Sequence, residues 1–297
     1  MIKKKLGRTG LEVTPLGYGS MGLRGPNTWG VRVVGEEDAD RCLNSVLDAG
    51  INFIDTAPDY GVSEERIGRY ISSRRSEFYL ATKCGCAYVQ HEDHLEIRHV
   101  WNKDVLQRNI ETSLQRLKTD FLDVLQFHGG DADTLQRKGL IELLMGYRDQ
   151  GIVRFIGVSS SLPQLPGLID LGVFDTFQIP YSCLAPEHHD WIAKAAGTGA
   201  GIIIRGGIAQ GGPDAEIQRP ALNDCWTRAK LDDVLPPRHE PCRVDPPLHA
   251  RPPALSHDHR GHVPSRTSGR EYRRRNKRAI ACPAVRGNPI ARCSAGR

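Results

Sequence analysis

The segment NFIDTAPDYG (residues 52–61) gives the strongest indication of the fold of this chain. It is a short apolar run that ends in ionisable residues, and ATK (81–83) and LQFH (125–128) repeat the pattern. Short apolar runs bounded by turn-forming residues are typical of buried parallel strands. The carboxyl ends of parallel strands meet at one edge of a sheet, so we expect one pocket to collect Asp55, Tyr60, Lys83 and His128. Such a set suits the donation of a proton to a carbonyl oxygen.

Strand-like and helix-like segments alternate along the first two thirds of the chain. The apolar runs predict seven strands, at residues 13–18, 53–54, 78–82, 124–127, 155–158, 176–179 and 201–204. Apolar residues at helical spacing predict helices at 36–48, 64–71, 103–117, 140–148, 165–171 and 187–196. Repeated strand–helix units imply a parallel sheet, and seven of them favour a closed α/β barrel of the (β/α)8 TIM type. Residues 236–262 are rich in Pro and support neither a last helix nor an eighth strand, so we expect an incomplete barrel.

The composition changes near residue 236, which divides the chain into a predicted barrel (1–235) and a tail (236–297). Residues 237–297 hold 14 Lys and Arg against 4 Asp and Glu, a net charge of +10, whereas the whole chain carries +5. The remaining residues therefore carry −5 and have an ordinary globular composition. The tail is rich in Arg and Pro, with one aromatic residue, and such a composition cannot bury enough apolar surface to offset chain entropy. We expect it to be disordered.

The remaining composition limits the cellular setting. The segment MIKKKL (1–6) has no apolar stretch typical of a signal peptide, and no apolar run approaches the length of a membrane span. The eight Cys and the His pairs show no zinc-ligand spacing, so we expect free thiols in a reducing cytoplasm, and no metal. We expect no membrane partner and no nucleic-acid partner, and the sequence does not indicate an oligomeric state.

Eight segments in register resemble the aldo-keto reductase family over residues 1 to about 235. They are LGRTGLEV (6–13), LGYG (16–19), DTAPDYGVSEERIGRYI (55–71), ATKCG (81–85), DVLQFHGGD (123–131), IGVSSS (156–161), FQIPYS (177–182) and GIIIRGGIAQGG (201–212). The resemblance implies an NADPH-dependent reductase of aldehydes or ketones. It also implies that Tyr60 is the proton donor, that Asp55 and Lys83 lower its pKa, and that His128 orients the carbonyl. A free Tyr has a pKa of about 10, and a nearby ammonium favours its phenolate.

The same resemblance implies a set of cofactor contacts. Ser159, Ser160 and Gln178 match positions that bind the nicotinamide carboxamide, and Arg205 stands where many relatives stack an aromatic ring on the nicotinamide. Backbone amides of the Gly-rich loop after the seventh strand match the pyrophosphate contacts, namely Gly206, Gly207, Ile208, Gln210 and Gly211. Specificity in such barrels lies in loops after the strands. Loops 22–34 and 85–102 are therefore predicted to contact the substrate, with Trp29, Tyr88 and Trp101 as stacking candidates.

The family pattern stops at the tail. Relatives continue with a helix, an eighth strand and a segment of the form GTxxPEHLxEN, which grips the 2′-phosphate of NADPH. None of these appears here, but removing the first base from permitted codons for residues 257–272 gives TTIVGTSRPEHLAENI. We therefore hypothesise a shift of reading frame near residues 236–237. We expect low stability, weak NADPH binding and, for the lack of the C-terminal cofactor segment, impaired activity of this chain.

Other interpretations remain open. Each of the four candidate residues, taken alone, is more often structural than catalytic, and only the joint pattern favours catalysis. One alternative is a non-catalytic regulatory protein on the same scaffold. Another is a nucleic-acid binder acting through the basic tail residues Arg270, Arg273, Arg274, Arg275, Lys277 and Arg278.

Overall fold

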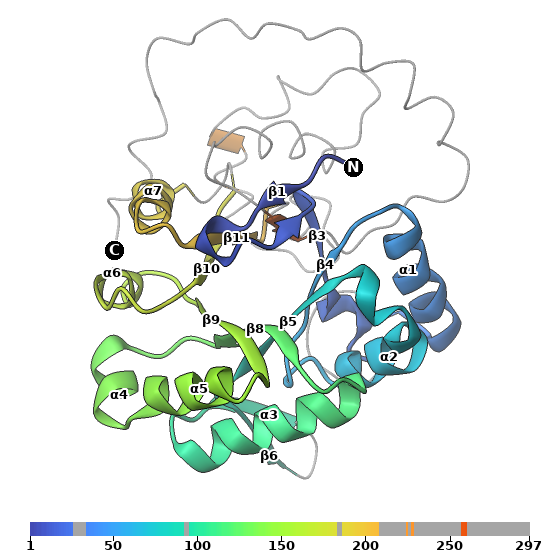
Figure 1. Cartoon of the computed structure of the whole chain (residues 1–297), viewed down its shortest axis with the longest axis horizontal. Helices are drawn as coiled ribbons and strands as arrows, with labels where there is room; N and C mark the ends of the chain where they lie inside the picture. The colour runs from blue at the N-terminus through green and yellow to red at the C-terminus, as the bar shows by residue number, and fades with distance from the viewer. Residues whose placement is uncertain are drawn as a thin grey trace, which may run out of the picture.

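Eight parallel strands form a closed barrel in this protein. The computed structural model describes residues 1–25, 34–91, 95–182, 186–207, 224, 227–228 and 257–259. The strand order around the barrel is β10-β11-β12-β3-β4-β5-β8-β9, and Figure 1 labels each of these strands except β12. The strands are β3 (Leu16–Gly19), β4 (Phe53–Asp55), β5 (Tyr79–Cys84), β8 (Leu122–Phe127), β9 (Val153–Ser159), β10 (Thr176–Pro180), β11 (Gly201–Arg205) and β12 (His257–His259). The predicted (β/α)8 class is confirmed.

Helices cover the outside of this barrel and surround its strands in Figure 1. They are α1 (Glu36–Asp48), α2 (Ser63–Tyr70), α3 (Lys103–Leu117), α4 (Ala132–Arg137), α5 (Leu140–Asp149), α6 (Leu165–Asp170) and α7 (His189–Gly197). All six predicted helices are present, and α4 is additional. Local sequence sets their ends: the Asn102 side chain accepts a hydrogen bond of 2.8 Å from the Val105 amide and so caps α3. Within the described residues, no helix is long and apolar enough to cross a membrane.

Successive residues along each strand point alternately outward and inward, which produces two apolar layers. Outward-facing residues such as Ile54, Leu80 and Leu125 pack against the helices in one large buried cluster. Their neighbours in the sequence, such as Phe53, Ala81 and Val124, form a second cluster with Leu6, Leu11, Val13 and Ile203. The N-terminal hairpin of β1 (Lys4–Lys5) and β2 (Glu12–Val13) brings the leucines of that cluster to the strands.

That hairpin fits closely against β11. A Cβ atom on Gly201 would lie 2.6 Å from Leu6 Cγ, nearer than such atoms approach, so glycine is required there. Both Leu6 and Val13 are fully buried. The second cluster therefore fills the barrel at the end where the strands begin and leaves the polar strand ends at the other.

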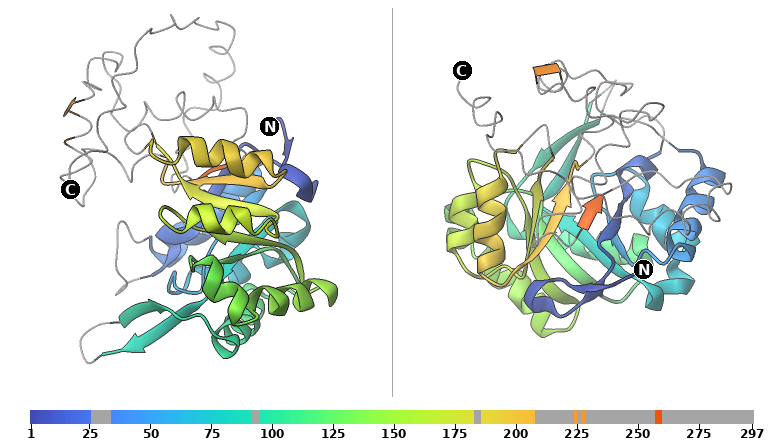
Figure 2. Two further views of the ribbon diagram at one scale, coloured as in Figure 1. Left: turned by 90° about the vertical axis from the view of Figure 1, so that its left-hand side faces the viewer. Right: turned by 90° about the horizontal axis from the view of Figure 1, so that it is seen from above.

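A second hairpin, which the sequence analysis does not predict, follows β5. Its strands β6 (Cys86–Gln90) and β7 (Leu95–His99) pair antiparallel over five residue pairs, from Cys86–His99 to Gln90–Leu95. Figure 2 shows it extending away from the barrel. Its base, where Cys86 and His99 meet, lies next to the end of β5 and so borders the candidate site.

The eighth barrel position corrects one expectation. The sequence analysis expects no strand within residues 236–262, but β12 occupies the gap between β11 and β3. It pairs His257 with Ile203 and Asp258 with Ile204 on one side, and Asp258 with Leu16 and His259 with Gly17 on the other. The unpaired backbone groups of the two flanking strands explain why a segment without strand propensity pairs here. The expected absence of a last helix concerns residues that lie mostly outside the described ranges.

Candidate active site

A buried ion pair joins the ends of β4 and β5. The Lys83 Nζ atom donates to Asp55 Oδ2 at 2.6 Å and to the Thr56 carbonyl oxygen at 2.7 Å. The side chain of Lys83 is fully buried and that of Asp55 is 4% exposed. Burial opposes the charge on Lys83, but the nearby Asp55 carboxylate outweighs it, so the pKa of Lys83 is raised above its ordinary value. The ammonium therefore stays charged at neutral pH.

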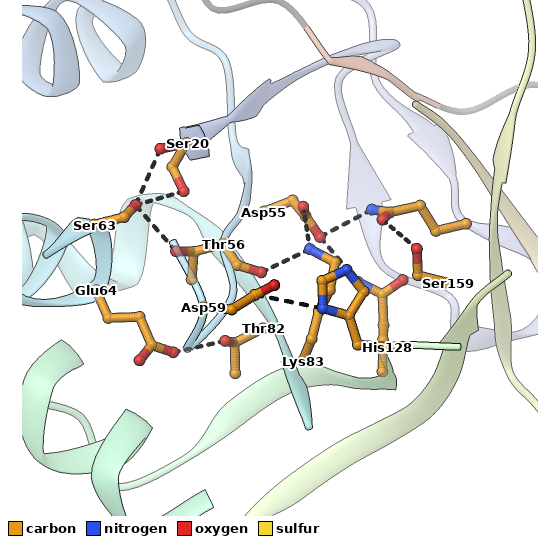
Figure 3. A network of polar contacts seen from close by, with 12 residues as sticks. Ser20, Asp55, Thr56, Asp59, Ser63, Glu64, Thr82, Lys83, His128 and Ser159 are labelled. Atoms are coloured by element: carbon orange, nitrogen blue, oxygen red, sulfur yellow. Dashed lines mark hydrogen bonds and ion pairs between the residues drawn. The ribbon is translucent and has the colours of Figure 1, made fainter. Parts of the chain in front are cut away.

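The second oxygen of Asp55 organises three more strands. Asp55 Oδ1 accepts hydrogen bonds of 2.9 Å from Gln126 Nε2 on β8 and from Gln178 Nε2 on β10. Gln178 Oε1 in turn accepts a 2.8 Å bond from the Ser159 hydroxyl on β9. Figure 3 shows this network. The sequence analysis missed Gln126, although a polar residue inside an apolar strand is a signal for such a role.

Tyr60 lies beside the ion pair. A turn in which the Tyr60 amide bonds to the Ala57 carbonyl at 3.0 Å sets its position after β4. The Lys83 Nζ atom lies 4.9 Å from the centre of the Tyr60 ring, and the ring of His128 meets that ring edge-on at 6.3 Å. The structure therefore brings together all four residues predicted from the sequence.

The direction of the Tyr60 shift differs from the expectation. Burial raises the pKa of Tyr60, the charge of Lys83 lowers it, and the carboxylates of Asp55 and Asp59 raise it again. The net pKa is above the ordinary value. Lys83 acts in the predicted direction, but the sequence could not show how much burial and the second carboxylate oppose it.

His128 belongs to a polar cluster that includes residues missed by the sequence analysis. Its backbone amide bonds to the Cys84 carbonyl at 2.9 Å, which fixes the residue just beyond β8. Its Nδ1 atom lies 3.3 Å from Cys86 Sγ and 3.4 Å from Asp59 Oδ1. Figure 3 shows Asp59 pointing at the ring. Burial raises the pKa of Asp59, but the hydrogen bond and charge of His128 outweigh it, so this pKa is lowered.

The predicted cofactor residues lie at the ends of the next three strands. Ser159 and Gln178 are buried partners of each other, and the Ser160 amide bonds to the Gln178 carbonyl at 3.0 Å. Arg205 ends β11, and burial lowers its pKa although the nearby Tyr60 and Asp55 raise it. Gly206 has a φ of +72°, and no atom of the described residues lies within 4 Å of where its Cβ would be. Gly207 follows as a buried turn residue, whereas Ile208, Gln210 and Gly211 lie outside the described residues.

The predicted substrate-stacking residues have different surroundings. Tyr88 is 38% exposed on β6, whereas Trp101 is half-buried and stacks on His99 at 6.2 Å. A Cβ atom on Gly85, where φ is +93°, would lie 2.2 Å from the Trp101 ring, so glycine is required for this packing. Trp101 therefore forms a fixed wall beside the cluster. Trp29 lies outside the described residues.

The fold and these side chains define a (β/α)8-barrel protein with a cluster suited to proton transfer at the carboxyl ends of its strands, where barrel enzymes place their active sites. The family model of the aldo/keto reductase family matches residues 15–214. The chain belongs to the aldo/keto reductase family of oxidoreductases.

Individual relatives are only moderately similar. The chain is 28% identical over 217 residues to the uncharacterized oxidoreductase YqkF of Bacillus subtilis, covering 71% of this chain and 66% of that protein. It is 32% identical over 193 residues to the aldo-keto reductase YhdN of the same species, covering 63% and 56%. It therefore spans between half and two thirds of the length of these relatives. The solved holo form of aldo-keto reductase AKR11C1 from Bacillus halodurans superposes with a TM-score of 0.70 at 26% identity, covering 87% of this chain and 85% of that one.

Proposed function

We propose that this chain reduces small aldehydes or ketones with NADPH, and that Tyr60 is the proton donor. The observation that carries the proposal is the position of Lys83. Its ammonium is held by Asp55 at 2.6 Å and lies 4.9 Å from the Tyr60 ring centre. A buried positive charge beside a phenol stabilises the phenolate that remains once the proton has left.

Each side chain has a distinct task in this reaction. Reduced nicotinamide, when bound, supplies the hydride. Tyr60 gives its phenol proton to the carbonyl oxygen, and Lys83 stabilises the negative charge that develops on the Tyr60 oxygen. Asp55 keeps Lys83 in place, and Gln126 and Gln178 hold Asp55 through bonds of 2.9 Å each. His128 orients the carbonyl, and hydrogen bonds to an oxygen that gains charge during reaction are typically the largest catalytic contribution.

The residues present fit a nicotinamide cofactor at the ends of β9, β10 and β11. Arg205 Nε is buried and has no hydrogen-bond partner among the described residues, so a polar group remains to be satisfied beside Tyr60. A guanidinium plane can also stack on a flat ring. The open space at Gly206 lets a phosphate approach the backbone. Ser159, Ser160 and Gln178 would contact the carboxamide.

The proposal includes a boundary near residue 236 and a shift of reading frame there. The structure supports it in one respect, because β12 lies at residues 257–259. Those residues are the ones that the shifted frame replaces with Thr-Thr-Ile, a more strand-prone sequence. The chain would then lack the segment that grips the 2′-phosphate and would bind NADPH weakly.

The described cysteines Cys42, Cys84 and Cys86 are free, which supports a cytoplasmic setting.

The test is carbonyl-dependent oxidation of NADPH by the purified chain, measured with a panel of small aldehydes and ketones. We expect turnover that Tyr60→Phe abolishes and that Tyr79→Phe, at the other end of β5, preserves. Absence of turnover by both this chain and a frame-restored chain would reject the proposal. It would favour the regulatory alternative, against which the intact contacts among the four side chains argue.

A further inference from the structure

Four side chains from separate segments converge beside Tyr60. Asp59 follows β4, Cys86 begins β6, His99 ends β7 and His128 follows β8. One potential ligand atom of each lies within 4.8 Å of the others. The sequence shows no zinc-ligand spacing and so predicts no metal, because this set spans residues 59 to 128 and is assembled only by the fold.

We propose that this cluster binds a divalent cation of the zinc class. One sulfur, two imidazole nitrogens and one carboxylate oxygen are the donors that zinc takes in proteins, usually four in a tetrahedron. Zinc-to-ligand distances of about 2.0–2.3 Å place the ligand atoms of such a tetrahedron roughly 3.3–3.6 Å apart. Cys86 Sγ and Asp59 Oδ1 already lie 3.3 and 3.4 Å from His128 Nδ1. The widest separation in the set would need to close by little more than about 1 Å.

A second observation concerns the carboxylate of Asp59. Asp59 Oδ1 is buried, the residue is 4% exposed, and its contact with His128 Nδ1 at 3.4 Å falls short of good hydrogen-bond geometry. Buried carboxylate oxygens are almost always satisfied, so this oxygen needs an explanation. It faces His128 and the rest of the cluster, where a cation would satisfy it.

Surrounding residues hold the ligands in place, as metal sites require. The amide of Cys86 donates to Asn109 Oδ1 at 2.9 Å, and the Asn109 side chain donates back to the Cys86 carbonyl at 2.9 Å. His99 lies between Trp101, on which it stacks, and the edge of His128 at 4.7 Å. The exposed His99 leaves the cation a path from solvent.

The direct test uses Co²⁺ as a spectroscopic probe of the full chain, followed by calorimetry with Zn²⁺. We expect a thiolate-to-cobalt charge-transfer band and the intense visible bands of a tetrahedral site. Cys86→Ser should remove the charge-transfer band. His99→Asn should weaken binding of Zn²⁺ by about 100-fold, the upper end of what losing even an outer-shell partner costs. Circular dichroism would verify that both variants fold.

A thiol outside the cluster provides the matched control. Cys42 bonds to Tyr18 at 3.3 Å on another part of the barrel, so Cys42→Ser should leave both metals unaffected. Other His and Cys residues of the sequence can bind metal as well, so the criterion is the loss of one equivalent in the cluster variants only. The proposal is overturned if the intact chain binds no Zn²⁺, or if Cys86→Ser and His99→Asn bind as the intact chain does.

One consequence rests on the proposed function. Because His128 would orient the carbonyl, a cation on this residue should inhibit reduction, and His99→Asn should raise the inhibiting concentration of Zn²⁺ by the same factor. The cobalt spectra require no turnover. An inactive chain with a normal cobalt site would therefore reject the reductase proposal alone, and an active chain with no cobalt site would reject the metal proposal alone.

Discussion

The ammonium of Lys83 is charged and fully buried. The ion pair with Asp55 is therefore needed for the stability of the fold as well as for the proposed chemistry. Removing one partner of a buried ion pair leaves an uncompensated buried charge, which lowers stability by about 3–5 kcal/mol. Lys83→Met leaves the Asp55 carboxylate buried with amide donors alone. We expect it to lower the free energy of unfolding by that amount in urea titrations.

An exposed ion pair serves as the control. Lys194 Nζ lies 2.9 Å from Asp170 Oδ1, and the two side chains are 49% and 64% exposed. Lys194→Met should therefore cost no more than about 1 kcal/mol. Equal losses from the two substitutions would mean that Lys83 is not confined as described.

The raised pKa of Tyr60 predicts how the reaction responds to pH. Since burial raises the pKa of Tyr60 above its ordinary value, the phenol keeps its proton throughout the neutral range and can donate it. Reduction should show no loss from Tyr60 ionisation below about pH 10. Oxidation of the alcohol product needs the phenolate instead, so its rate should still be rising at pH 10.

The rates of carbonyl reduction and of alcohol oxidation, measured as a function of pH, test this prediction. The Tyr60→Phe variant shows any pH dependence that comes from other groups. A plateau of alcohol oxidation below about pH 9 would contradict it, because it would require a Tyr60 pKa lower than that of free tyrosine.

The sequence could identify those site residues that end a strand, and it missed those that the fold brings in from the side. Asp55 and Lys83 follow apolar runs, so their position at a strand end is readable from the pattern. Cys86 and His99 reach the site only because β6 and β7 pair, which brings the two residues together at the base of the hairpin next to β5. Ser63, the first residue of α2, likewise depends on the fold, because its hydroxyl bonds to Ser20 at 2.8 Å and to Thr56 at 3.1 Å.

At the scale of elements, α2 and α3 pack together through a glycine. A Cβ atom on Gly68 would lie 2.0 Å from the Arg116 carbonyl oxygen, which is backbone and cannot move aside. Gly68→Ala should therefore push the two helices apart and destabilise the protein by about 1–3 kcal/mol, as overpacking does.

A glycine on another helix should respond in the opposite direction. Gly146 lies within α5, and no atom in the described part of the chain lies within 4 Å of a Cβ atom placed there. Gly146→Ala should stabilise by up to about 1 kcal/mol through helix propensity. Unfolding curves of the two variants separate the effect of close packing from that of helix propensity. A change of the unfolding free energy in the same direction for both variants would contradict this account of the α2–α3 contact.

Elements with a buried face were predicted well, and those defined by pairing alone were not. Helix α3 has the predicted bounds because its apolar residues repeat at helical spacing and Asn102 caps it. Among the residues of the β6–β7 hairpin whose burial is described, only Cys86 is buried. A two-stranded ribbon depends on its pairing more than on composition. The three residues of β12 carry no strand signal of their own, and the gap between β11 and β3 selects them.

For the whole molecule, β12 is the strand with short joins on both of its sides and with only three residues. It shares two register pairs with each neighbour, as β3 and β4 also do, whereas β10 and β11 share five. A barrel is stabilised by having no open edges, so the join on either side of β12 should open first under denaturant. Hydrogen exchange should be faster for the amides of β3 and β11 than for those of β8.

Restoring the proposed frame near residue 236 should therefore change stability and cofactor binding together. The restored chain would replace His257–His259 with Thr-Thr-Ile and would add the segment that grips the 2′-phosphate. Each charge-assisted bond to that phosphate contributes about 1.5–3 kcal/mol, so NADPH should bind at least about 10-fold more tightly. NADH lacks this phosphate, so its affinity should change much less, and fluorescence titration with both cofactors separates the phosphate contacts from general stabilisation. Equal increases in affinity for NADH and NADPH would mean that the restored chain binds cofactor better because its barrel closes, and not because it gains phosphate contacts. An unchanged affinity for both cofactors would contradict the frame-shift hypothesis. A gene sequence with an intact reading frame around codon 236 would contradict it as well.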